Sequence, residues 1–210
     1  QAWQLGAAEL AAVRGFTPEV VQALLAVRKS AEARREAERD LERARRAGLR
    51  VRCYGTPGYP PRLKEIPLPP PVLYQYGPWE PDNRDERPVV AIVGTRRPTA
   101  YGLAVAEQLG RELARLGAVV VSGMARGIDT AAHRGALSAG GTTVAVLGGG
   151  ADVCYPHESA ALYRKMRETG AVLSEQPPGT APRPENFPER NRIISGLSHG
   201  VILVEAGERS

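Results

Sequence analysis

The stretch VVAIVGTRRPTAYGLAVAEQLGRELARLGAVVVSG, residues 89–123, holds two short Val-rich runs separated by a segment with helical periodicity. The runs VVAIVG (89–94) and AVVVSG (118–123) do not alternate apolar with polar residues, which is typical of strands covered on both faces. A helix that connects two such strands is the crossover of a parallel sheet. This stretch therefore predicts one unit of a doubly wound α/β fold.

The same pattern continues along the chain in both its strands and its helices. Further apolar runs are TVAVLGGG (143–150), AVLSE (171–175) and VILVEA (201–206). Helical stretches are predicted at 102–116, 129–139, 158–169 and about 190–198. The fold class is therefore α/β, with a Rossmann-like, doubly wound, mostly parallel sheet over residues 88–210.

Two other parts are predicted before this sheet. Residues 1–52 are expected to form a small all-α domain of the SAM or helix-hairpin-helix kind, with two short helices that meet around Gly15. Thr17 followed by Pro18 and Glu19 is a helix start. Residues 53–87 are rich in proline, which predicts an extended connector in which PVLYQYG (71–77) forms a short edge strand.

The composition is that of an ordinary globular protein, with 42% hydrophobic and 24% charged residues among 210. The formal net charge of +5 permits a polyanionic partner without requiring one. From Arg28 to Arg52 the chain is strongly basic. This segment is interpreted as a solvated helix face, with nucleic-acid contact as the alternative.

Cysteine usage and hydropathy indicate a cytoplasmic protein. Cys53 and Cys154 lie far apart and belong to no CxxC or His-containing cluster, so they are expected to be buried free thiols, and no metal site is predicted. The sequence has no run of 18 apolar residues and no leader pattern, which disfavours membrane insertion and secretion.

Gly-rich turns follow the predicted strands at the edge where such sheets bind ligands. They include residues 94–98, 122–129 and 147–156. Their backbone amides could hold a phosphate, or the glycines could serve only tight strand-to-helix connections. Neither GxGxxG nor GxxxxGK[ST] occurs, which argues against a dinucleotide dehydrogenase and a P-loop NTPase. No cofactor is predicted.

Catalytic groups are hard to assemble from this sequence. The three histidines are separated and accompany no nucleophile motif; His133 is interpreted as structural and Asp129 as a first-turn acid of the same helix. Glu175 and Glu205 end two strands and could be general acid/base groups, although carboxylates satisfied by backbone or arginine are the favoured interpretation. A binding protein is therefore predicted, and no catalytic residue.

The segment FPERNR (187–192) points to single-stranded nucleic acid. A base can stack on Phe187, arginines can hold the adjacent phosphates, and an amide can contact sugar or base edges. Residues expected to act together are Arg96, Arg97, Arg126, Phe187, Arg190, Asn191 and Arg192. The plainer alternative is a core phenylalanine surrounded by surface arginines.

Six ordered motifs resemble those of the DNA-processing protein A family, also called DprA or Smf. They are VGTRRPTAYG, SGMARGIDTAAHRGAL, TVAVLGGGADVCYP, LSEQPPG, FPERNRIISGLS and VILVEA, and the similarity spans residues 88–210. YPPRLKEIPLPPPVLYQYG resembles the family's entry segment. Ser159 departs from the family, which usually has Asn there.

The resemblance implies a cytosolic bacterial homodimer that binds incoming single-stranded DNA during natural transformation, protects it and helps to load the RecA recombinase, without turnover. It implies that the DNA pocket contains Gly94, Thr95, Arg96, Phe187, Arg190, Asn191 and Arg192. For the SGMARGID turn it implies a backbone-phosphate or structural role of Ser122, Gly123, Gly127 and Asp129. The family's fold continues beyond Ser210.

Two other functions are possible for a sheet of this type. A nucleotide phosphoribohydrolase shares this type of sheet, but it needs a PGGxGTxxE motif where this chain has VEAGERS (204–210). A small-nucleotide sensor or carrier is compatible with the Gly-rich turns, but it leaves Phe187 and the dispersed arginines without a role.

Overall fold

The structure, a computed structural model, describes residues 5–13, 17–81 and 87–207. The chain divides into two compact units, residues 1–43 and 44–210. The boundaries predicted from the sequence lie at residues 52 and 87, whereas the large unit begins at residue 44 and contains the whole proline-rich segment together with the sheet. The large unit contains every residue of the predicted DNA pocket.

The small unit is helical over its described residues. It contains α1 (Ala7–Ala11), α2 (Pro18–Lys29) and most of α3 (Ala31–Ala47). Thr17 caps α2, because its side-chain oxygen accepts a hydrogen bond from the amide of Val20 at 3.4 Å, and Pro18 occupies the first turn as predicted. The predicted helix junction around Gly15 lies outside the described residues.

The large unit is built on a seven-stranded sheet with the order β1-β2-β6-β5-β4-β3-β7. Its parallel strands are β3 (Val89–Val93), β4 (Val119–Ser122), β5 (Thr143–Val146), β6 (Ala171–Ser174) and β7 (Gly200–Leu203). The central runs β4, β5 and β6 are buried along their whole length. The predicted α/β fold with a mostly parallel sheet is confirmed.

Two antiparallel strands extend the sheet beyond β6. The strand β2 (Val72–Tyr76) pairs with β6 on one side and with β1 (Arg50–Cys53) on the other. The sequence predicted β2 as an edge strand, whereas the structure places it inside the sheet. The strand β1 was not predicted, because three of its four residues fall in the segment 1–52 that was expected to be helical. Arg52 is buried there, because its guanidinium bonds Gln75, Gly58 and Glu80.

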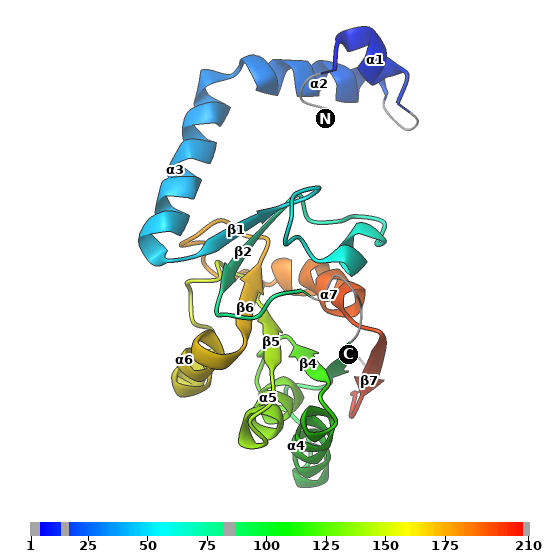
Figure 1. Cartoon of the computed structure of the whole chain (residues 1–210), viewed down its shortest axis with the longest axis vertical. Coiled ribbons are helices and arrows are strands. Elements are labelled where there is room, and N and C mark those ends of the chain that lie inside the picture. Colours follow the sequence, from blue (N-terminus) through cyan, green and yellow to red (C-terminus); the bar gives the residue numbers. More distant parts are fainter. Residues whose placement is uncertain (1–4, 14–16, 82–86, 208–210) are drawn as a thin grey trace. The chain divides into compact units, whose positions relative to one another are not determined.

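Helices cover both faces of the sheet (Figure 1). The helices α4 (Ala100–Arg115), α5 (Ile128–Ser138) and α6 (Ala160–Thr169) pack on one face, the last preceded by a 3-10 turn, η3 (His157–Ser159). The helix α7 (Asn186–Leu197) and the 3-10 turn η2 (Pro61–Lys64) pack on the other. The predicted helical stretches 102–116, 129–139 and 158–169 are thereby confirmed, with ends shifted by one or two residues.

The cysteines differ in part from expectation. Both are free thiols, but Cys53 is exposed and Cys154 is half-buried, so the prediction of buried thiols is wrong for Cys53. Over the part of the chain that the structure describes, no helix is both long enough and apolar enough to cross a membrane.

Candidate nucleic-acid interface

The FPERNR segment forms the first half of α7. The helix begins at Asn186, four residues before the predicted start near 190, so Phe187 is helical instead of lying in a loop. Pro188 falls in the first turn, where its missing amide hydrogen costs no intrahelical bond. Residues 187, 190 and 191 are spaced by three and four and therefore share one side of the helix.

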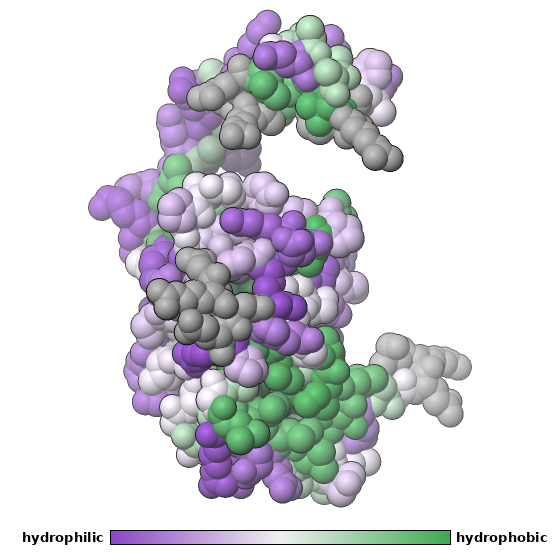
Figure 2. All heavy atoms as spheres, turned by 45° about the vertical axis from the view of Figure 1, so that its right-hand side comes forward, coloured by the Kyte–Doolittle hydropathy of each residue, from purple (hydrophilic) through white to green (hydrophobic). Residues whose placement is uncertain are grey.

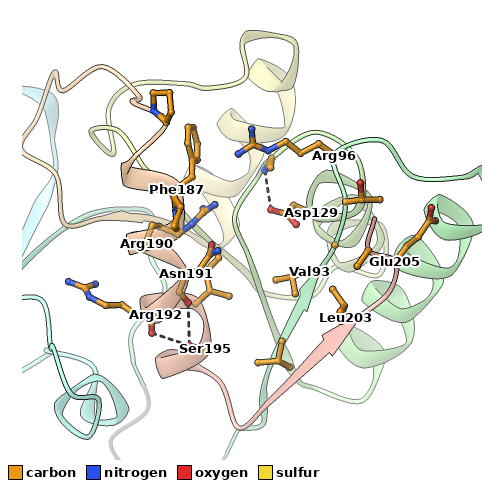
Figure 3. Close-up of a pocket in the computed structure, with 18 residues that line it drawn as sticks. Val93, Arg96, Asp129, Phe187, Arg190, Asn191, Arg192, Ser195, Leu203 and Glu205 are labelled. Carbon is orange, nitrogen blue, oxygen red and sulfur yellow. Dashed lines mark hydrogen bonds between the residues drawn. The ribbon is translucent and has the colours of Figure 1, made fainter. Parts of the chain in front are cut away.

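A pocket of about 630 Å³ opens between α7 and the carboxyl ends of β3 and β7. All seven residues of the predicted DNA pocket line it: Gly94, Thr95, Arg96, Phe187, Arg190, Asn191 and Arg192. Figure 3 shows the α7 side chains along one wall, with Arg96, Val93, Leu203 and Glu205 across from them. The structure thus gathers segments that lie far apart in sequence around one space.

Arg96 and Phe187 meet at this pocket. The guanidinium carbon of Arg96 lies 4.8 Å from the centre of the Phe187 ring, which is a cation–π contact. Arg96 is exposed and Phe187 is half-buried. An exposed cation beside an accessible ring is what a stacked base with its neighbouring phosphate requires.

The Phe187 ring packs against the turn after β5. The side-chain amide of Asn186 donates to the carbonyl of Gly148 at 2.8 Å, and a Cβ atom added to Gly148 would lie 3.2 Å from the ring. A Cβ atom added to Gly149 would lie 2.9 Å from the carbonyl oxygen of Thr180. These glycines therefore permit close packing within the protein, which supports the structural interpretation of the LGGG turn.

Arg190 points into the protein, unlike Arg96. Its side chain is only 4% exposed, and its Nη1 atom donates to the carbonyls of Gly123, at 2.9 Å, and Val146. Burial lowers the pKa of Arg190 to about 10, and the nearby Asp129 opposes this shift. We predicted a phosphate contact; the geometry shows instead a guanidinium that ties α7 to the ends of β4 and β5.

Asp129 closes the turn between β4 and α5. Its buried carboxylate accepts hydrogen bonds from the amides of Gly123 and Ala125, each at 3.2 Å. Burial raises the pKa of Asp129, while Arg190 and these amides lower it. The amides that could have bound a phosphate are therefore engaged within the turn.

The two carboxylates considered for catalysis are engaged as well. Glu205 accepts from the amide of Thr99 at 3.1 Å and from its hydroxyl at 2.9 Å, at the start of α4. Glu175 pairs with Arg192 at 2.5 Å. Both contacts support the structural interpretation of these residues.

Arg192 separates the pocket from a second hollow of about 600 Å³. The polar side chains that line that hollow are Glu175, Gln176, Glu189 and Arg192, of which Glu175 and Arg192 pair with each other. In Figure 3 the Arg192 side chain points away from the other α7 residues of the first pocket. The first pocket is the better nucleic-acid site, because it alone of the two contains the exposed Arg96 and the Phe187 ring.

Five predicted residues do not line the first pocket: Arg97, Ser122, Gly123, Arg126 and Gly127. Ser122 is fully buried and donates its hydroxyl to the carbonyl of Ile92 at 2.6 Å, so its side chain has no surface to offer a ligand. Gly127 has a φ of +84° and lies against the Thr95 carbonyl, where only glycine fits well. Arg126 is exposed and pairs with Glu158.

The pocket also has an apolar side, which the sequence did not predict. It is formed by Val93 and Ile194 together with Val201 and Leu203 of β7. The two β7 side chains are 51% and 63% exposed, respectively. Figure 2 shows apolar surface gathered over the lower part of the sheet unit. The pocket therefore offers cationic, aromatic and aliphatic surface together.

His133 is structural, as predicted from the sequence. It is fully buried, and its Nδ1 atom lies 2.7 Å from the Thr143 hydroxyl, which itself donates to the Val120 carbonyl. Nδ1 must therefore carry the proton. Burial lowers the pKa of His133 to about 3.

Among residues 5–13, 17–81 and 87–207, no group of three or more Asp, Glu, His or Cys side chains could hold a metal ion.

Tyr155 is the residue at this edge that sequence reasoning missed. It follows β5, is 41% exposed, and its ring centre lies 5.9 Å from that of Phe187. The only signal in the sequence was an aromatic residue within a Gly-rich turn at the ligand-binding edge.

Fold and pocket together define a Rossmann-like protein with an aromatic and cationic site beyond the carboxyl ends of its parallel strands. The family described as DNA recombination-mediator protein A matches residues 50–210. The chain belongs to this family, as its six motifs suggested.

Named relatives agree with this assignment. Protein Smf of Synechocystis is 38% identical over 212 residues, covering 100% of this chain and 52% of the relative. The DNA processing protein DprA of Bacillus subtilis is 43% identical over 166 residues, covering 79% of this chain and 55% of the relative. The chain thus spans about half the length of these relatives.

Two solved structures share the fold. DNA processing protein A of Streptococcus pneumoniae superposes with a TM-score of 0.77 at 34% identity, covering 99% of this chain and 69% of that one. The Helicobacter pylori protein, described with a single-stranded DNA binding mode, gives a TM-score of 0.67 at 32% identity. That comparison covers 78% of this chain and 73% of the other.

Proposed function

We propose that this chain binds single-stranded DNA in the pocket between α7 and the ends of β3 and β7. Bases stack against Phe187, and Arg96 neutralises the adjacent phosphate. Asn191, exposed in the same pocket, contacts sugar or base edges. The single observation that carries the proposal is the exposed Arg96 guanidinium 4.8 Å from the Phe187 ring at the pocket.

The contacts favour a strand over a free nucleotide. A nucleotide-binding α/β protein offers free helix N-termini and turn amides to the phosphate. Here Glu205 engages the amide and hydroxyl of Thr99 at the start of α4, and Asp129 engages the turn before α5. The cations and the aromatic ring, which a strand uses, lie on side chains at the surface.

A preference for single strands tests the proposal. Fluorescence anisotropy would compare a labelled oligothymidine with the same label in a blunt duplex, because a duplex hides the base faces. We expect clearly tighter binding to the single strand; equal affinities would contradict the proposal. Nucleoside monophosphates, at concentrations similar to that of the oligothymidine, are expected not to displace it. We also expect no release of free base from them when they are incubated with the protein.

Family membership extends the proposal to the role of the protein in the cell. We propose that it acts in the bacterial cytoplasm during natural transformation as a homodimer without catalytic turnover. It would protect incoming single strands and help to load RecA onto them. Family membership supports these roles, and the pocket supplies the strand contact on which each of them depends.

RecA loading has its own test. On single strands covered by a single-stranded DNA-binding protein, the natural chain should shorten the lag before DNA-dependent ATP hydrolysis by RecA. The Phe187→Leu form of that chain should leave the lag long. An equal lag with and without the natural chain would refute the loading role without affecting strand binding.

A further inference from the structure

The turn after β5 presents a second aromatic ring beside Phe187. The Tyr155 and Phe187 ring centres are 5.9 Å apart with the planes inclined by 44°. Tyr155 is 41% exposed, and within the described part of the chain its hydroxyl has no hydrogen-bond partner. The ring is therefore accessible to a ligand on its open side.

The backbone around Tyr155 is fixed while its side chain is open. The Val153 amide donates to the Gly150 carbonyl at 2.9 Å, and the Ser159 amide donates to the Pro156 carbonyl at 3.0 Å. Pro156 itself is buried. The ring is thus held in place by a stable turn, and a ligand that used it would order little of the chain.

The two rings form one continuous surface. The hollow that both rings line is only about 10 Å³, too small to hold a base between them. Phe187 lines both this hollow and the large pocket, whereas Tyr155 lines only the hollow. Phe187 therefore lies between the large pocket and Tyr155, and Tyr155 is the next aromatic ring beyond it.

Two exposed arginines lie in turns at this edge of the sheet. Arg96 lies over the Phe187 ring, and Arg126, in the turn after β4, pairs with Glu158. A single strand can use cationic and aromatic side chains on one surface.

We propose that Tyr155 is a second stacking residue, so that the bound strand crosses from the pocket over Phe187 and places its next base on Tyr155. This inference rests on the proposed function, because it concerns the path of the same strand. The inclined rings would keep the two bases unstacked from each other, each against its own side chain.

Affinity provides the first part of the test. Binding of labelled oligothymidine would be measured for the natural sequence and for Tyr155→Leu, Tyr155→Phe and Tyr101→Leu. Tyr101 is a suitable control, because it is 79% exposed on α4 and lines neither pocket. We expect Tyr155→Leu to bind roughly five- to 150-fold more weakly, which corresponds to the loss of one stack, and the other two variants to bind normally.

A spectroscopic measurement separates stacking from indirect effects. Bases that stack on tryptophan quench its fluorescence, so Tyr155→Trp should show additional quenching by unlabelled oligothymidine, whereas Tyr101→Trp should not. Equal thermal unfolding midpoints for all variants would show that the turn is intact. If Tyr155→Leu did not fold, the quenching of Tyr155→Trp would decide whether Tyr155 stacks with a base.

The outcomes distinguish the inference from the function beneath it. Normal affinity of Tyr155→Leu together with no added quenching in Tyr155→Trp would overturn the inference, while Phe187→Leu still weakened binding. If the natural sequence itself ignored oligothymidine, the proposed function would fall and the inference with it.

Discussion

The guanidinium of Arg96, in the turn after β3, lies 4.8 Å from the centre of the Phe187 ring on α7. A base that stacks on this side of the ring must displace or share the guanidinium, which is then free to contact the phosphate. One residue pair thereby links base stacking to charge neutralisation.

Replacing Arg96 by glutamine should reveal its phosphate contact. The log–log dependence of affinity on salt should flatten by roughly 0.7, the value for one phosphate contact on a single strand. Arg96→Lys should keep the slope, because the charge remains. An unchanged slope in Arg96→Gln, measured by anisotropy across a salt series, would assign Arg96 another role.

Arg190 should behave differently, because it is buried against the carbonyls of Gly123 and Val146. Arg190→Gln should lower the free energy of unfolding by about 1–3 kcal/mol, as buried acceptors lose a charged donor. Urea denaturation would measure this loss. Arg97→Gln, at an exposed position of the turn after β3, is the control and should change little; equal midpoints for both variants would contradict the structural role of Arg190.

His133 should make stability depend on pH. Its folded-state pKa is about 3, below the ordinary value near 6.5, so the unfolded chain binds the extra proton as pH falls below 6.5. Stability is therefore lost on acidification, by about 2 kcal/mol between pH 7 and pH 5 from this residue. Urea denaturation at both pH values would measure this. Between pH 7 and pH 5, the free energy of unfolding of His133→Gln should fall by about 2 kcal/mol less than that of the natural sequence. Equal falls for the two proteins would contradict burial of a neutral imidazole.

The pairing of Arg126 with Glu158 predicts a gain of binding. Glu158→Gln removes the carboxylate that holds the Arg126 guanidinium and should steepen the salt dependence by roughly one phosphate contact, about 0.7. Glu168→Gln removes the same charge from an exposed Lys165 pair on α6 and is the matched control. If both variants show the same slope, Arg126 does not reach the strand.

Much of this fold follows from local sequence pattern. Buried parallel strands give unbroken Val-rich runs, so the strands and the helices between them could be located. The strand β1 could not, because its RVRC sequence continues a basic helical segment. Arg52 is buried there because its guanidinium meets Gln75 of the neighbouring strand β2 and Glu80 of the loop that follows β2.

The sequence predicts which residues form the site better than it predicts how their side chains are arranged. Strand ends converge on one edge, which brought Arg96 and Phe187 together as expected. No pattern near Arg190 indicates that its partners are carbonyls at the ends of two distant strands. The position of Tyr155 beside Phe187 likewise depends on how two loops pack, which their separate sequences do not show.

The most direct test of the central claim is oligothymidine binding by Phe187→Leu. Anisotropy across a salt series would be measured, with thermal unfolding as the control for folding. We predict a loss of about 1–3 kcal/mol in binding free energy, because one stack is removed, with an unchanged salt slope. A folded Phe187→Leu variant that binds as tightly as the natural sequence would contradict the assignment of this pocket as a base-stacking site.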